Sequence, residues 1–142
     1  MNLISITTAI TTAALFALSA PAIAGDAAKG ETEFKKCKAC HSIVADDGTE
    51  IVKGGKTGPN LYGVIGRTAG TADFKYGDSI IAAGVAGVVW DETNFVTYIA
   101  DPKAFLIEAT GDKGAKTKMS IKLAKGGDDL AAYLASVGPA AN

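Results

Sequence analysis

The 142-residue chain contains few of the side chains that most often bind metals or act as nucleophiles. It has two cysteines, Cys37 and Cys40, and one histidine, His41. Structural zinc sites usually take four Cys or His ligands, and no fourth is present here. Fourteen basic and fifteen acidic side chains give a net charge of −1. So small a net charge does not indicate a nucleic acid partner.

The first 24 residues contain no charged side chain. Residues 9–18 are mostly apolar, and Ala22, Ile23 and Ala24 supply the small-x-small pattern of a signal-peptidase site. These features predict a signal peptide over 1–24, cleaved after Ala24, and an exported domain over 25–142 that lies in the periplasm. An uncleaved membrane anchor is the alternative, but the apolar run is short and rich in threonine. We therefore expect no stable membrane insertion after cleavage.

Cys37 and Cys40 stand three residues apart, and His41 follows at once. Cys-X-X-Cys-His is the pattern of a c-type haem attachment site. On one helical turn the two thiols can each form a thioether with a haem vinyl group, and the imidazole then faces the iron. A thioredoxin-like redox pair is one alternative, but it needs βαβ patterning, which the downstream sequence lacks. A structural disulfide is another, although so tight a loop would be strained and would constrain little of the chain.

Capping residues and helical periodicity predict an all-α fold whose helices cover about 26–40, 79–83, 91–100, 102–106 and 127–137. Residues 42–57 and 108–118 are predicted as polar loops. The first helix places Gly30 and Phe34 on the face of Cys37, and a glycine there is explained by close approach of another helix. The natural partner is the apolar stripe of the last helix, formed by Leu130, Tyr133, Leu134 and Val137.

Apart from the initiator, Met119 is the only methionine, and it ends a polar, lysine-rich loop. A thioether suits ferrous iron and raises the reduction potential, so we predict Met119 as the sixth ligand. The alternatives are a Met packed elsewhere with the sixth site open, or a lysine in its place. Pro59 offers a carbonyl that could accept from the His41 ring and orient it. Arg67, the only arginine, could pair with a haem propionate, or be an ordinary solvated charge.

Lysines are concentrated around these motifs. Five lie at positions 113–125, a stretch without an acidic residue, and Lys36 and Lys38 stand on either side of Cys37. We predict that they form a positive ring that steers the protein to acidic partner surfaces, with a solvated surface of mixed sign as the alternative. The predicted ring consists of Lys36, Lys38, Lys113, Lys116, Lys118, Lys122 and Lys125.

Taken together, these motifs resemble the class I cytochromes c, and most closely their bacterial periplasmic cytochrome c2 group. The resemblance covers essentially all of 25–142. It rests on Gly30, Phe34, 37–41, 57–61, 66–67, 74–76, Trp90, Tyr98, 101–102, 117–119, Leu130 and Tyr133. It implies a small cytochrome c fold in which the N- and C-terminal helices cross and loops enclose one covalently bound haem c.

The resemblance also implies roles for single residues. Cys37 and Cys40 would be the thioether sites, and His41 and Met119 the axial iron ligands. Other residues would surround the haem: Pro59 on His41, Tyr98 near the Met119 sulfur, and Tyr76, Trp90 and Arg67 near the propionates.

The expected function is that of a monomeric one-electron carrier rather than an enzyme. The resemblance implies a cytochrome bc complex as the electron donor and a photosynthetic reaction centre or a terminal oxidase as the acceptor. The rival is a haem enzyme or gas sensor with an open sixth site. That rival predicts a labile Met119 and a high-spin spectrum in the resting protein.

Overall fold

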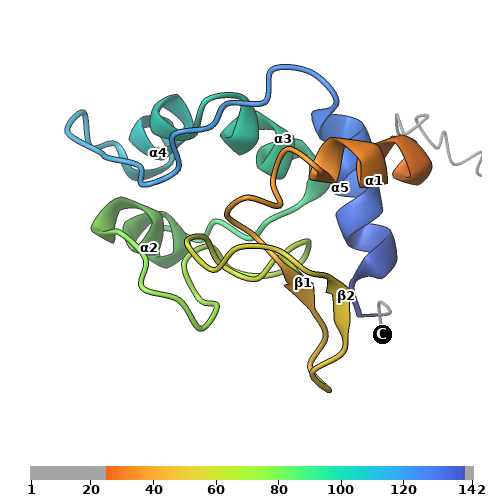
Figure 1. Ribbon diagram of the computed structural model, residues 1–142. Coiled ribbons are helices and arrows are strands. Elements are labelled where there is room, and N and C mark those ends of the chain that lie inside the picture. The colour runs from red at the N-terminus through yellow and green to blue at the C-terminus, as the bar shows by residue number, and fades with distance from the viewer. Residues whose placement is uncertain (1–24, 140–142) are drawn as a thin grey trace, which may run out of the picture.

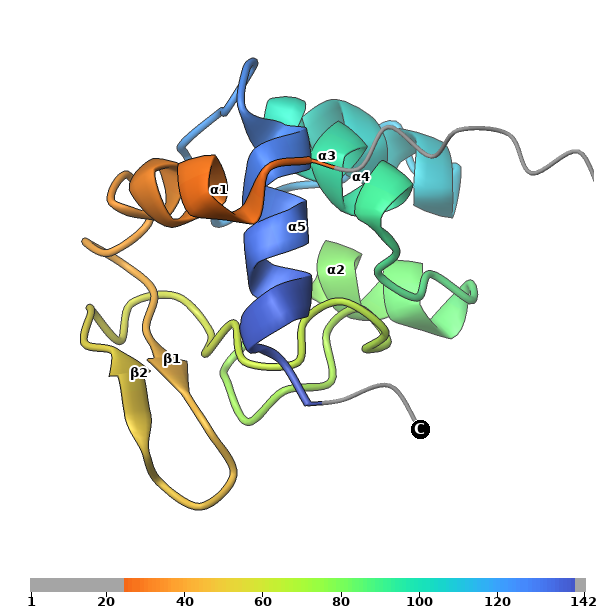
Figure 2. The ribbon, with the colours of Figure 1, turned by 90° about the vertical axis from the view of Figure 1, so that its right-hand side faces the viewer.

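Two helices from opposite ends of the chain cross at the centre of the fold, α1 (Ala27–Phe34) and α5 (Gly127–Val137), as Figures 1 and 2 show. The structure is a computed structural model that describes residues 25–139. At the crossing, a Cβ added to Gly30 would overlap the carbonyl oxygen of Asp129 and lie 2.6 Å from Tyr133 Cβ. The rings of Phe34 and Tyr133 pack beside this point with centroids 6.0 Å apart. The predicted helix crossing is confirmed.

Asp26 begins α1 and also joins it to α5. Its carboxylate accepts hydrogen bonds from the N–H groups of Ala28 and Lys29, as an N-cap does. Its own N–H donates to the Asp129 side chain at 2.7 Å. Both ends of the domain are therefore fastened together at the first turn of each helix.

The prediction that the first helix runs to Cys40 is wrong. It ends at Phe34, where the N–H groups of Cys37 and Lys38 both bond to the Phe34 carbonyl, at 2.8 and 3.1 Å. Shared acceptors of this kind replace the regular α-helical ladder by tight turns. The chain from 35 to 40 therefore continues as a series of turns, which place both cysteines at the edge of the cavity described below.

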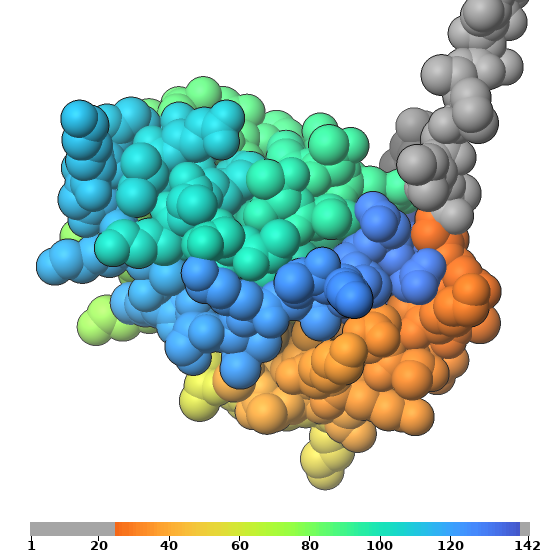
Figure 3. Space-filling view, turned by 90° about the horizontal axis from the view of Figure 1, so that it is seen from above, coloured from red at the N-terminus to blue at the C-terminus, as the bar shows by residue number. Residues whose placement is uncertain are grey.

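The remaining helices form a layer over the other side of the domain. Helix α3 (Glu92–Ala100) packs on α5, α4 (Pro102–Thr110) packs on α3, and α2 (Asp78–Val85) packs on α4. Asp91 caps α3 through a capping box with Asn94, and Asp101 caps α4 with Pro102 at its first position. Figure 3, seen from above, shows the segment leading into α5 (blue) lying between α3 and α4 (teal) and the α1 region (orange).

Two helices are longer than predicted. Helix α2 begins after Gly77, not after Asp78, and continues to Val85. Helix α4 does not stop at Leu106, because no breaker intervenes before Gly111, which ends it in the left-handed conformation at φ 71°. The polar loop predicted from Glu108 therefore begins at Gly111.

The predicted loop over 42–57 contains a short antiparallel hairpin, β1 (Ile43–Val44) and β2 (Glu50–Val52). Ile43 is fully buried, which pins the first strand to the core. Gly48, at φ 86°, makes the turn. With five helices and this one hairpin in residues 25–139, the expectation of an all-α fold holds.

Within residues 25–139 no helix has both the length and the apolar character needed to cross a bilayer. The predicted signal peptide, 1–24, lies outside the described residues.

Candidate haem-binding site

A cavity of about 240 Å³ opens between the turns after α1, helix α3 and the segment that precedes α5. Most of its walls are apolar, and part of them is formed by side chains of the buried core. They include Leu61, Val64, Phe95, Ile99, Leu106 and Leu130. The predicted site residues 37, 40, 41, 59, 67, 76, 90, 98 and 119 all border this one cavity. The structure thus brings together residues that are up to 82 positions apart.

Both cysteine thiols are free and partly buried. The N–H groups of Cys40 and His41 donate to the same Cys37 carbonyl, at 3.0 and 2.9 Å, so the three residues form one tight turn. Burial, followed by the nearby charge of Glu33, raises the pKa of the Cys37 thiol to about 11. A thioredoxin-like redox pair needs a thiol whose pKa is lowered, so this environment argues against that alternative.

The His41 ring is held in one orientation. Its Nδ1 lies 2.7 Å from the Pro59 carbonyl oxygen, which can only accept, so Nδ1 carries the proton and the Nε2 lone pair is left free. Burial lowers the pKa of His41, and the Pro59 carbonyl partly opposes this shift. Gly58 allows the close approach, because a Cβ there would lie 2.8 Å from both ring nitrogens. The lowered pKa of His41 favours the neutral imidazole, which is the form that ligates metals.

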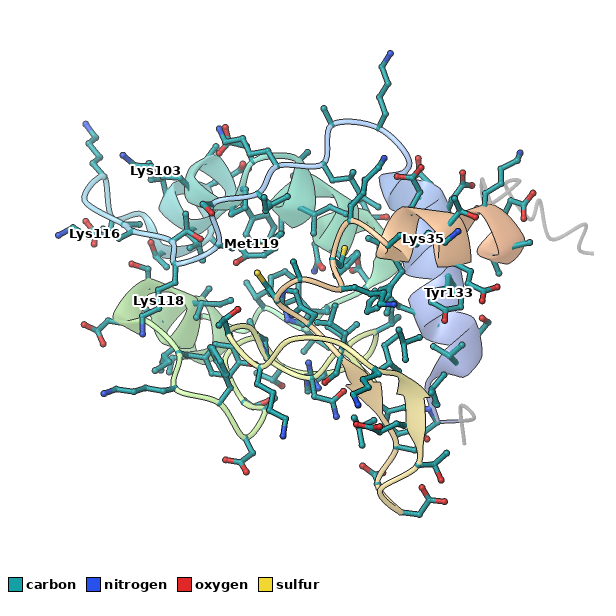
Figure 4. The ribbon with its side chains drawn as sticks, in the orientation of Figure 1. Lys35, Lys103, Lys116, Lys118, Met119 and Tyr133 are labelled. Atoms are coloured by element: carbon teal, nitrogen blue, oxygen red, sulfur yellow. The ribbon has the colours of Figure 1, made fainter. Side chains whose placement is uncertain are left out.

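Met119 borders the same cavity from the segment before α5 (Figure 4). The Thr117 hydroxyl accepts from the Met119 N–H at 3.0 Å and donates to the Met119 carbonyl at 3.3 Å. These bonds fold the backbone around the methionine. The Tyr98 phenol is also nearby: burial raises its pKa, and the Thr117 side chain partly offsets that rise.

Aromatic rings line one wall of the cavity. Trp90 lies 5.0 Å from Tyr98 and 5.6 Å from Phe105, measured between ring centroids. Trp90 is 5% exposed and Tyr98 9% exposed. Tyr76 is half-buried and packs edge-on against Phe74 at 5.2 Å. Phe74, Tyr76, Trp90 and Tyr98 border the cavity, and Phe105 packs against Trp90 outside its lining.

Arg67 is not an ordinary solvated charge. Its guanidinium donates through Nη1 to the Tyr62 carbonyl and through Nη2 to the Asn60 carbonyl, both at 3.1 Å. Burial lowers its pKa, and the charge interaction with Tyr76 opposes this. The side chain therefore braces the 60–62 turn while it borders the cavity.

The seven predicted docking lysines do not share one environment. Lys36 pairs with Glu33, and Lys122 pairs with Asp101 at 2.7 Å. The Lys118 ammonium donates to two backbone carbonyls. All seven are exposed, and within residues 25–139 four of them form neither a side-chain ion pair nor a side-chain hydrogen bond: Lys38, Lys113, Lys116 and Lys125.

Sequence reasoning missed two side chains that position the site. The Asn60 amide donates to the Val44 carbonyl at 2.7 Å and accepts from the Val44 N–H at 3.0 Å, which fastens the hairpin to the Pro59 segment. Ser79 on α2 accepts from the backbone N–H of Lys116 at 2.9 Å. Asn60 lies in the 57–61 motif on which the family resemblance rests. No local sequence pattern predicts that it bonds to Val44, or that Ser79 bonds to Lys116.

Terminal helices that cross at a glycine, with a Cys-X-X-Cys-His turn and a methionine on one apolar cavity, define a class I cytochrome c. Comparisons with known proteins specify the class further. The cytochrome c2 of Rhodobacter capsulatus is 69% identical over 131 residues, which cover 92% of this chain and 95% of that protein. The cytochrome c-550 of Paracoccus denitrificans is 53% identical over 133 residues, 90% of this chain and 86% of that protein. No family model matches the chain.

Solved structures agree with the sequence relatives. The cytochrome c2 structure from Rhodobacter capsulatus matches with a TM-score of 0.78, covering 80% of this chain and 98% of that one. The structure of ferric cytochrome c-550 from Paracoccus versutus matches with a TM-score of 0.78 at 56% identity, covering 81% and 99%. The chain belongs to the cytochrome c2 family. It is therefore an electron carrier whose cofactor is one covalently bound haem c.

The residues present fit this cofactor. Two free thiols and a neutral imidazole with a free Nε2 lone pair stand on one turn, and a thioether borders the same apolar cavity. In residues 25–139 no three His, Cys, Asp or Glu side chains gather into a metal site. An iron held by a porphyrin needs only two protein ligands, so no such group is required.

Proposed function

We propose that this chain is a diffusible carrier of single electrons in the periplasm, with Cys37 and Cys40 as the thioether sites and His41 and Met119 as the axial ligands. The observation that carries the assignment is the 2.7 Å contact between His41 Nδ1 and the Pro59 carbonyl, which leaves Nε2 free at the cavity. When bound, the haem supplies one-electron exchange between ferric and ferrous iron. The protein's own residues tune that exchange.

Each side chain has a defined task in this proposal. Pro59 holds the imidazole in one tautomer and raises its basicity as a ligand. The apolar walls exclude water, and the Met119 thioether favours the ferrous state. Arg67, Tyr76 and Trp90, which border the cavity, would stabilise the propionates, and Tyr98, which also borders it, would lie near the Met119 sulfur. His41 and Met119 would both hold the iron, so neither ligand would need to be exchanged when the haem gains or loses an electron.

An absorption spectrum tests the ligand pair. The oxidised protein is expected to show a near-infrared sulfur-to-iron band, which Met119→Ala removes while the covalently bound pigment remains. A resting protein that is high-spin and lacks the band would instead favour the open sixth site of an enzyme or gas sensor. Mass analysis of Cys37→Ala and Cys40→Ala singly and together tests the tether, since the double variant should carry no covalently attached macrocycle.

We also propose that residues 1–24 are a signal peptide cleaved after Ala24, so that the mature protein is a soluble periplasmic monomer. The uncharged leader and its small-x-small end support this. N-terminal sequencing of the protein from the periplasmic fraction should begin at Gly25. A chain that retains Met1 and sediments with membranes would support the anchor instead.

The proposed partners are a cytochrome bc complex as donor and a photosynthetic reaction centre or terminal oxidase as acceptor. The lysines around the cavity mouth support acidic docking surfaces on these partners; Lys36, Lys116 and Lys118 border the cavity itself. Charge reversal at Lys116, which is exposed and has no side-chain ion pair within residues 25–139, is the cleanest probe.

Lys116→Glu should slow second-order association with the bc complex, and the difference should shrink as salt is raised, because exposed charges are screened over about 10 Å at 0.1 M. Lys29→Glu is the control, since Lys29 is exposed on α1, does not border the cavity, and has only a solvent-exposed 3.5 Å ion pair with Asp26. Equal association rates for the two variants at low salt would contradict steering through this surface.

A further inference from the structure

The segment that carries Met119 has no regular structure of its own. Between the end of α4 at Thr110 and the start of α5 at Gly127 there is neither helix nor strand. Without a hydrogen-bonded ladder, its position depends on contacts with the rest of the protein. Any group that holds this segment therefore controls where the Met119 thioether lies.

Downstream of Met119, the contacts go to the layer of α3 and α4. The Leu123 N–H donates to the Ile99 carbonyl at 2.8 Å, and Lys122 pairs with Asp101 at 2.7 Å. These contacts hold only one end of the segment. The residues from 111 to 118 could still lift away as an arm unless something fastens them as well.

Upstream of Met119, the contacts go to residues 75–79. Ala115 is 1% exposed, and the next residue, Lys116, donates its N–H to the Ser79 hydroxyl at 2.9 Å. The Lys118 ammonium donates to the Lys75 carbonyl at 3.1 Å and to the Tyr76 carbonyl at 3.3 Å. The Ser79 side chain thus fastens the arm to the first turn of α2, and the Lys118 side chain fastens it to the segment before that helix.

The two lysines on this arm behave differently. In Figure 4 the Lys118 side chain reaches down toward the segment before α2, whereas Lys116 points outward. The chain of Lys118 also runs along Gly77, where an added Cβ would lie 3.5 Å from Lys118 Cε. Lys118 is therefore held in place across the boundary between the two segments, and the side chain of Lys116 is not.

We propose that Ser79 and Lys118 are positioning residues for Met119, which keep the upstream arm closed and so keep the thioether on the iron. The inference rests on the proposed His41/Met119 ligation. Lys118 then acts mainly through its bonds to the Lys75 and Tyr76 carbonyls, and its charge toward partners is secondary. Opening of the arm exchanges those bonds for bonds to water and frees the sixth position.

Binding of imidazole to the ferric holoprotein measures this opening, because an added ligand competes with Met119 for the iron. Each of Ser79→Ala and Lys118→Gln should bind imidazole about five-fold more tightly than the unmodified protein, which corresponds to about 1 kcal/mol. The double variant should bind about 25-fold more tightly if the two contacts act independently. The loss of the near-infrared sulfur band reports the displacement directly.

Two controls isolate the contacts. Lys116→Gln removes the same charge from the same arm, and it should leave imidazole affinity within two-fold of the unmodified value. Ser79→Thr keeps the hydroxyl and should restore most of the original affinity. A purely structural effect of the Ser79→Ala change would not be reversed by a threonine hydroxyl.

The outcomes separate the two proposals. If the unmodified ferric protein lacks the sulfur band, the ligand assignment and this inference both fail. If the band is present but Lys118→Gln and Lys116→Gln bind imidazole equally, Lys118 does not position Met119. If Ser79→Ala binds imidazole with the same affinity as the unmodified protein, Ser79 does not position Met119.

Discussion

Gly30→Ala is a direct test of the crossing between α1 and α5. An alanine Cβ would overlap the Asp129 carbonyl oxygen and lie 2.6 Å from Tyr133 Cβ, and neither a backbone carbonyl nor a Cβ can rotate away. The helices would have to separate, and overpacking of this kind costs about 1–3 kcal/mol. Alanine regains about 1 kcal/mol of helix propensity over glycine. With the clash at the upper end of its range, the net loss is about 2 kcal/mol.

Guanidinium unfolding of the holoprotein, followed by far-ultraviolet circular dichroism, gives this number from the shift of the midpoint at unchanged slope. A loss of about 2 kcal/mol is a large part of the 5–15 kcal/mol that stabilises a typical domain. Ala28→Gly is the control on the exposed side of the same helix; because Ala28 lies in the first turn, the variant should lose at most the interior propensity difference of about 1 kcal/mol. The close-approach argument is refuted if Gly30→Ala is as stable as the unmodified protein, or more stable.

Two further predictions follow from single contacts. Arg67→Lys should lower the free energy of unfolding by about 1–3 kcal/mol, because one ammonium cannot replace a guanidinium that reaches the Asn60 and Tyr62 carbonyls together; an unchanged denaturation midpoint would show that the brace is dispensable. The pKa of Asp101 is lowered, chiefly by Lys122. The stability it contributes is thus present above the ordinary pKa of an aspartate and is lost as pH falls through the lowered value. Asp101→Asn should flatten the acid limb of a stability–pH curve, and an unaltered limb would count against the pairing.

Helix positions followed from local signals where those signals were complete. Capping signals predicted helices that begin near 91 and 102, and in the structure Asp91 and Asp101 cap α3 and α4. The end of α1 could not be predicted, because Ala27 to Cys40 contains no breaker near Phe34 and the tight turns arise from how the cysteine segment packs. The hairpin was missed for a related reason: two strands of two and three residues are too short to show alternation.

Some features of the candidate site could also be predicted from the sequence, and others could not. The residues that attach and ligate the haem could be predicted from the sequence because so few candidates exist. After the leader, the chain has only two cysteines, one histidine and one methionine. The environments of the lysines, in contrast, could not be predicted from the sequence. Seven looked equivalent in the sequence, yet Lys36, Lys118 and Lys122 are engaged by neighbours and Lys116 is not.

By itself, the sequence determined which atoms can tether and ligate the cofactor, because residue identity and a three-residue spacing are properties of the chain alone. Only the tertiary structure decided how those atoms are held. Lys118 meets Lys75 across 43 positions, and His41 meets Pro59 across 18. The physical reason is that such bonds join loops whose paths are set by the packing of helices elsewhere in the fold. The loop sequences have no periodic pattern from which those paths could be predicted.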